Sequence, residues 1–140
     1  MSSFNLGGLS FDAFSGLSPH INKKVSACLA NEGPIPPGIY YILDRKSGGF
    51  LGSLLDRLKG RSDWFALYAE DAEIDDATYC REVLRGNFRL HPKGIYGVSK
   101  GCIVIEKQHE FHFLRSMLRS VKPRAIPGSE LHAYGKLAVR

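Results

Sequence analysis

Short runs of apolar, β-branched and aromatic residues, bounded by glycine, proline and charged residues, recur along the chain and predict strands. The clearest of these runs span residues 39–43, 64–68, 88–91, 102–105 and 131–139. Within residues 4–22, apolar and polar positions alternate up to a glycine, which predicts a strand or hairpin near the start.

Helical periodicity is clear in one segment. Residues 107–120 place apolar side chains three and four positions apart, which predicts an amphipathic helix. Its apolar stripe consists of Phe111, Leu114, Leu118 and Val121. A second, shorter helix is predicted over residues 51–59, where Leu51, Leu54, Leu55 and Leu58 follow the same spacing. The pattern as a whole predicts a mainly β fold with one or two packed α-helices.

Length and composition are those of a compact globular protein. With 140 residues, 44% of them hydrophobic and 24% charged, the chain has room for one core, so we expect a single domain over residues 1–140. A net charge of +5 favours anionic partners without naming one. No nucleic-acid motif accompanies the basic residues of the predicted helix, so we expect a solvated face and no nucleic-acid partner. These basic residues are Arg115, Arg119, Lys122 and Arg124.

Two further features concern membranes and targeting. No apolar stretch approaches the roughly 18–20 residues that a spanning helix needs, so we expect no membrane span. The first residues lack the cationic and apolar regions of a secretory signal peptide. We therefore expect synthesis in the cytoplasm without a signal peptide.

The three cysteines form no CxxC pair, so their spacing predicts neither a zinc finger nor a closed disulfide framework. A bridge between Cys28 and Cys80 is possible in an oxidising compartment, and the sequence leaves it open. His109 and His112 lack a complete ligand set for zinc, and the acidic run 70–76 lacks the regular spacing of a calcium loop. We therefore expect no metal and no cofactor.

Candidate chemistry gathers in residues 91–105. Because a thiol is nucleophilic only as thiolate, a working cysteine needs a nearby base, and a chain reversal would bring His91 to Cys102. A proline and two glycines between them favour such a reversal. Gly101 leaves space for a substrate carbonyl, whose developing oxyanion the N–H groups of residues 101 and 102 would face, and Ser99 is placed to hydrogen-bond the loop or the imidazole. The competing interpretation is a buried core cysteine, since residue 102 opens an apolar run.

This segment resembles the active-site motif of L,D-transpeptidases, in which a histidine is followed, after a loop, by Ser/Thr-His-Gly-Cys. The agreement is closer with one branch, the type VI secretion L,D-transpeptidase effectors, which are antibacterial toxins that act on peptidoglycan. Similarity to that branch extends over most of the chain, in ordered blocks at residues 33–36, 38–42, 44–45, 47–49, 85–92, 97–103, 127–128 and 133–135. Lys100 replaces the second histidine of the wider family and Val104 replaces an arginine, and the effector branch shares this reduced pattern.

The resemblance implies a small L,D-transpeptidase-like β-sandwich or barrel. It also implies that His91 deprotonates Cys102, whose thiolate attacks the carbonyl of the third residue of a peptidoglycan stem and expels the terminal D-alanine. Resolution of the thioester by water is an L,D-carboxypeptidase reaction, and resolution by an amine is exchange. Stem carboxylates need basic contacts, for which we expect Arg89 first, because it shares a strand face with His91, and then Arg85 and Arg45.

Partners and place of action follow from the same resemblance. It implies peptidoglycan stem peptides as substrate, contact with secretion machinery, an immunity protein that blocks the Cys102 cleft, and action in the periplasm of a target bacterium. A second hypothesis is a non-catalytic peptidoglycan-binding or protein-interaction module on the same fold, favoured if Cys102 is buried and reacts slowly. A papain-like hydrolase is disfavoured, because its cysteine precedes its histidine and opens a helix.

Overall fold

The computed structural model describes residues 2–45, 63–94 and 101–140. The helix predicted over residues 51–59 lies outside this part of the chain. The described elements are β1 (Ser2–Leu6), β2 (Leu9–Ser15), the 3₁₀ helix η1 (Lys24–Ser26), β3 (Gly38–Asp44), β4 (Phe65–Ala69), β5 (Ala77–Cys80), β6 (Val83–Gly86), β7 (Arg89–Pro92), β8 (Ile103–Ile105), α2 (Gln108–Arg119), β9 (Arg124–Ala125), β10 (His132–Ala133) and β11 (Gly135–Val139).

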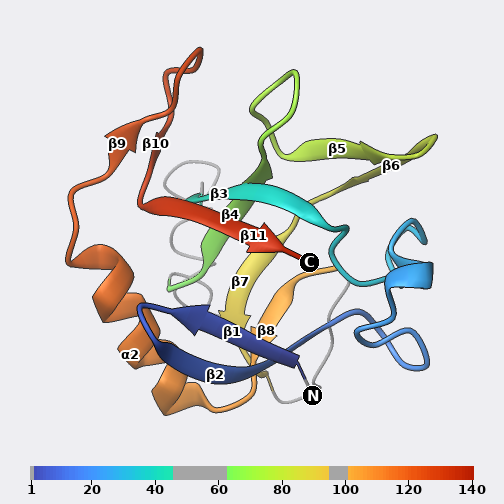
Figure 1. Ribbon diagram of the computed structural model, residues 1–140, viewed down its shortest axis with the longest axis horizontal. Coiled ribbons are helices and arrows are strands. Elements are labelled where there is room, and N and C mark those ends of the chain that lie inside the picture. Colours follow the sequence, from blue (N-terminus) through green and yellow to red (C-terminus); the bar gives the residue numbers. More distant parts are fainter. Residues whose placement is uncertain (1, 46–62, 95–100) are drawn as a thin grey trace, which may run out of the picture.

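A seven-stranded sheet in the order β1-β2-β8-β7-β4-β3-β11 forms the body of the molecule and curls into a half-barrel (Figure 1). Within it β7 and β8 run parallel, and the other neighbouring strands run antiparallel. The β5–β6 hairpin and the short β9–β10 pair stand off this sheet as separate ribbons (Figure 1). The structure therefore confirms the mainly β fold with a packed helix.

The core lies on the inner face of the curled sheet. Because side chains alternate along a strand, Tyr40 and Ile42 of β3 enter this core, and Tyr41 and Leu43 face a second, smaller cluster on the outer side. Helix α2 adds its apolar stripe to the main core, which it shares with every strand from β1 to β4 and with β7 and β8. The members of this stripe are Phe111, Leu114 and Leu118.

Most of the predicted strands are confirmed with their ends shifted by about one residue, which is the ordinary uncertainty of element boundaries. They are β3, β4, β7 and β8, and the alternating start of the chain forms the β1–β2 hairpin. The prediction of one strand over residues 131–139 is wrong, because His132–Ala133 pairs with β9 and Gly135–Val139 pairs with β3. Val121 is also misplaced, since it lies beyond the end of α2 and is 50% exposed.

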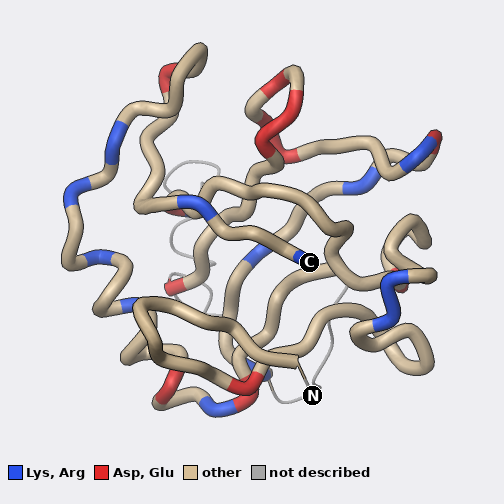
Figure 2. Tube along the Cα trace, in the orientation of Figure 1, with Lys and Arg blue, Asp and Glu red and all other residues tan. Residues whose placement is uncertain are grey.

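Charged residues gather outside the sheet. The acidic run 70–76 forms the connection from β4 to β5, and the basic residues of α2 continue along the segment that leads to β9 (Figure 2). No helix among the described residues is long and apolar enough to cross a membrane.

Candidate active site

The candidate residues meet on the outer face of β4, β7 and β8. Strand β7 lies between the other two, with Leu90 opposite Phe65 of β4 and opposite Ile103 of β8. All three of these side chains point into the core. Because alternate side chains point to opposite faces, Arg89 and His91 project from the outer face on either side of Leu90.

Cys102 lies directly before β8 on this same outer face. Its neighbour Ile103 faces the core, and Cys102 is partly exposed and belongs to neither core cluster. Continuing the β7–β8 register by one residue puts Cys102 beside Arg89, so His91 is its diagonal neighbour. These placements disfavour the core-cysteine interpretation.

Strands β7 and β8 do not form the antiparallel pair that a simple turn between His91 and Cys102 would give. The two strands run parallel, and residues 95–100 between them lie outside the described part of the chain. The parallel pair still brings His91 and Cys102 to one face of the sheet. Leu90 pairs with Ile103 and both face the core, so their neighbours Arg89, His91 and Cys102 all face the other side. Ser99, expected to hydrogen-bond the loop or the imidazole, lies outside the described residues.

The imidazole of His91 is buried, with 5% of its surface exposed. Its ring stacks on Trp64, with the ring centroids 4.2 Å apart and the planes 17° from parallel. Its Nδ1 lies 2.8 Å from the carbonyl oxygen of Pro92, which only accepts hydrogen bonds, so in the neutral ring Nδ1 carries the proton. This tautomer leaves the lone pair on Nε2, as a general base requires.

Charged side chains surround the thiol. The guanidinium of Arg89 donates two hydrogen bonds, of 2.8 and 2.6 Å, to the two carboxylate oxygens of Asp76. Arg45 lies over the Trp64 ring, 5.7 Å from its centroid. The thiol of Cys102 donates a long hydrogen bond, 3.8 Å, to the carbonyl oxygen of Asn87.

Burial sets the protonation state of the pair. It raises the pKa of the Cys102 thiol above its ordinary value, against a lowering by the Arg89 backbone and by the charges of Arg89 and Arg45. Burial also lowers the pKa of His91, and the hydrogen bond to Pro92 opposes that shift in part. Both groups are therefore uncharged at neutral pH, Cys102 as a thiol and His91 as a neutral imidazole.

Arg85 lies against the backbone of Gly101, the residue before Cys102. Gly101 has a φ of +101°, which favours glycine, and a Cβ there would lie 2.6 Å from Nη2 of Arg85 and 2.9 Å from the Phe88 ring. The space beside Gly101 is thus filled by protein side chains on that side. Arg85 is 3% exposed and donates hydrogen bonds to backbone carbonyls, so its surroundings favour a structural role over contact with substrate.

Three residues of this site were not singled out for it by the sequence. The sequence placed Trp64 in the strand run 64–68, Asp76 in the acidic run 70–76 and Asn87 in the block of resemblance 85–92, with no role in catalysis or binding for any of them. For Trp64, the alternation of side chains along a strand is the one signal in the sequence. Trp64 directly precedes Phe65, which pairs with Leu90, so continuing that register puts Trp64 opposite His91. That signal becomes usable only once β4 and β7 are known to be neighbours.

Other parts of the described chain offer different features. A cleft of about 680 Å³ separates the edge strands β1 and β11, and its lining includes Lys24, Ile35, Ile103 and Leu137 but neither His91 nor Cys102. No group of three or more His, Cys, Asp or Glu side chains in the described ranges could hold a metal ion.

Comparison with known proteins gives one match. The family model described as the Tlde1 domain matches residues 9–129 of the 140-residue chain. No curated protein and no solved structure shows significant similarity to the chain. The matched range includes His91, Cys102 and every other residue of the outer face described above.

Proposed function

The chain belongs to the Tlde1 domain family of type VI secretion effectors, which target peptidoglycan, and we propose that it removes or exchanges the terminal D-amino acid of peptidoglycan tetrapeptide stems by cysteine catalysis. The observation that carries this proposal is the juxtaposition of Cys102 and His91 on one sheet face. The imidazole there is held neutral, with its Nε2 lone pair available.

The reaction proceeds through a thioester. Nε2 of His91 takes the proton from Sγ of Cys102, and the sulfur forms a bond to the carbonyl carbon of the third stem residue. Collapse of the tetrahedral intermediate breaks the bond to the terminal D-alanine, whose amine receives the proton from His91. Attack by water on the thioester regenerates the thiol and completes hydrolysis, and attack by the amine of a D-amino acid completes exchange.

Basic side chains next to the sulfur fit a substrate that carries free carboxylates. Arg89 lies level with Cys102 across the β7–β8 register, and Arg45 lies over the Trp64 ring that stacks on His91. Arg89 is already fixed by Asp76, which holds its guanidinium in one orientation and leaves further donors for a substrate carboxylate. We assign Arg89 and Arg45 to substrate binding on this basis.

The proposed setting follows from the family. A type VI effector is secreted into a target cell, where its peptidoglycan substrate lies in the periplasm. A producer needs protection from such an activity, and an immunity protein that covers the Cys102 face is the partner we propose. The second partner that we propose is the type VI secretion machinery.

Mass spectrometry of purified tetrapeptide muropeptides incubated with the protein tests the central proposal. The wild type should release one D-alanine per stem, and Cys102→Ala should release none, because no thioester can form. Arg89→Ala in the same assay should require a higher substrate concentration for the same rate, because a carboxylate contact is lost.

Each other result has a defined meaning. A mass change that needs added D-amino acids indicates exchange rather than hydrolysis. No change with folded wild-type protein, on both tetrapeptide and pentapeptide stems, would contradict the catalytic proposal and favour the non-catalytic binding module. Release by Cys102→Ala equal to that of the wild type would remove Cys102 as the nucleophile.

A further inference from the structure

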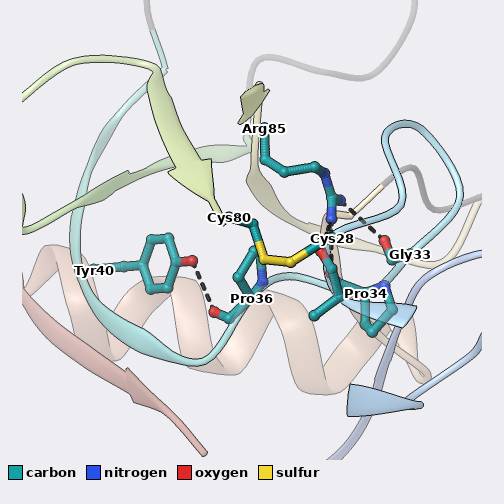
Figure 3. The surroundings of a disulfide bond; sticks show 8 residues. Cys28, Gly33, Pro34, Pro36, Tyr40, Cys80 and Arg85 are labelled. Atoms are coloured by element: carbon teal, nitrogen blue, oxygen red, sulfur yellow. Dashed lines mark hydrogen bonds between the residues drawn. A yellow bond between two sulfur atoms is a disulfide. The ribbon is translucent and has the colours of Figure 1, made fainter. Parts of the chain in front are cut away.

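The buried side chain of Arg85 on β6 is hydrogen-bonded to the loop over residues 27–34. The guanidinium of Arg85 donates hydrogen bonds to the carbonyl oxygens of Gly33, at 3.1 Å, and Pro34, at 3.2 Å, and also to that of Ala27 (Figure 3). Its charged plane lies 5.3 Å from the centroid of the Phe88 ring. A buried guanidinium requires such partners, so the loop over residues 27–34 and the position of Arg85 depend on each other.

The same guanidinium forms the floor beneath the residue before Cys102. Its Nη2 occupies the side of Gly101 where any larger residue would place its Cβ, together with the edge of Phe88. Displacement of Arg85 would remove this support, and the N–H and Cα of Cys102 follow directly in the chain. Burial and the charges of Arg89, Asp76 and Arg45 shift the pKa of the Cys102 thiol. The contact that Arg85 makes here is with the backbone position of Gly101.

A covalent bond ties both sides of this arrangement together. Cys28, which follows Ala27 in the loop, forms a disulfide with Cys80 at the end of β5. Strand β5 pairs with β6 so that Thr78 lies opposite Arg85. The disulfide thus fastens the loop that accepts the hydrogen bonds to the hairpin that supplies the donor (Figure 3).

We propose that Arg85 is a positioning residue for Cys102 and that the Cys28–Cys80 disulfide holds it in place, so that full activity requires the oxidised protein. This inference rests on the proposed function, because it concerns the nucleophile of that reaction. Closing the bridge removes two protons and two electrons from the two thiols. A disulfide-containing oxidant accepts them and is itself reduced to a dithiol.

The consequence concerns where the enzyme is active. Cytosolic thiols are kept reduced, and disulfides form in oxidising compartments such as the bacterial periplasm. A secreted effector with this arrangement would be made with Cys28 and Cys80 reduced, so that the loop over residues 27–34 is not yet linked to β5. It would reach full activity after delivery. Full activity would therefore coincide with arrival in the compartment that holds the substrate.

The test compares Arg85→Met, Arg85→Lys and the double variant Cys28→Ser/Cys80→Ser with the wild type. Arg124→Met serves as the matched control, because Arg124 is an exposed arginine on β9. Two quantities are measured on protein shown to be folded by circular dichroism: kcat and KM on tetrapeptide muropeptides, and the rate of alkylation of Cys102 by iodoacetamide as a function of pH.

A misplaced nucleophile lowers the chemical step more than binding. We expect kcat to fall between about tenfold and about 100-fold in Arg85→Met and in the double variant, with KM changed by less than about twofold. The alkylation rate of Cys102 should change in the same two variants. Arg85→Lys should lie between them and the wild type, since an ammonium donates to fewer of the carbonyls. Arg124→Met should match the wild type.

Folded variants with kcat and alkylation rate within about twofold of the wild type would overturn the proposal. If Arg85→Met does not fold, Arg85→Lys and the double variant decide the same question. If the wild type releases no D-alanine, the proposed function fails, and the alkylation rates still decide whether Arg85 and the disulfide position Cys102. Equal activity of wild-type protein before and after reduction with dithiothreitol would refute the redox requirement alone.

Discussion

At the scale of single residues, the site combines a cysteine that resists ionisation with a histidine that resists protonation. Both tendencies have one cause, the removal of the charged forms from water. Trp64 covers one face of the imidazole and Pro92 fixes its Nδ1, so the ring is oriented before substrate binds. In the proposed reaction, such a pair would transfer its proton during the attack and would not hold a thiolate in advance.

The pH dependence of activity should show this resting state. Because burial lowers the pKa of His91, the imidazole takes up a proton only below its usual value of about 6.5. We expect kcat/KM for D-alanine release to stay constant as the pH falls from about 7.5 to about 6.5 and to decline only below that.

Circular dichroism at each pH is the control for that profile. The unfolded chain binds the His91 proton near its ordinary pKa, and the folded chain binds it only at lower pH, so stability also decreases below about 6.5. An acid limb centred at or above that value, in folded protein, would show that a neutral buried His91 is not the base.

At the scale of elements, hydrophobic periodicity predicted those strands and helices whose burial pattern is set by neighbouring residues. The run 39–43 forms a strand buried on both faces, and residues 108–119 form a helix with one buried stripe, as their patterns indicate. The β5–β6 hairpin escaped prediction because its apolar residues do not alternate with polar ones toward a common core: Tyr79, Val83 and Leu84 are exposed, and the one buried side chain is that of Arg85. The Cys28–Cys80 disulfide and the hydrogen bonds of Arg85 join the hairpin to the loop over residues 27–34, and neither link leaves a periodic pattern in the sequence.

Helix α2 should owe its stability to its buried stripe. Leu114 is 0% exposed within the main core, so Leu114→Ala removes buried methyl groups and leaves a cavity. We expect the free energy of unfolding in urea to fall by about 2–5 kcal/mol. His109→Ala, an exposed position on the same helix, should change it by less than about 0.5 kcal/mol. Equal effects of the two substitutions would contradict the packing of α2 described above.

At the scale of the whole molecule, the disulfide joins segments 52 residues apart in the sequence. Cross-linking a chain over that distance removes conformational entropy from its unfolded state, which stabilises the fold by about 4 kcal/mol in the chain-entropy model. We therefore expect Cys28→Ser/Cys80→Ser to unfold at a lower urea concentration than the wild type. Cys102→Ser, which leaves the bridge intact, is the control, and coincident unfolding curves for all three proteins would refute the expectation.

The sequence by itself determined most strands of the main sheet, the helix α2, the mainly β class and the family, because each depends on neighbouring residues or on ordered short motifs. It also placed Arg89 and His91 on one strand face, since alternation is a local property. The interpretation of residues 1–140 as one domain and the catalytic roles stay predictions.

Only the tertiary structure decided which strands are neighbours. The stack of Trp64 on His91, the pair of Asp76 with Arg89, and the position of Cys102 beside them all arise from the order β8-β7-β4 and from the loop before β5. Sheet order and the Cys28–Cys80 bridge join residues far apart in sequence, and the free energy that selects them comes from burial over the whole core. No local pattern carries that information.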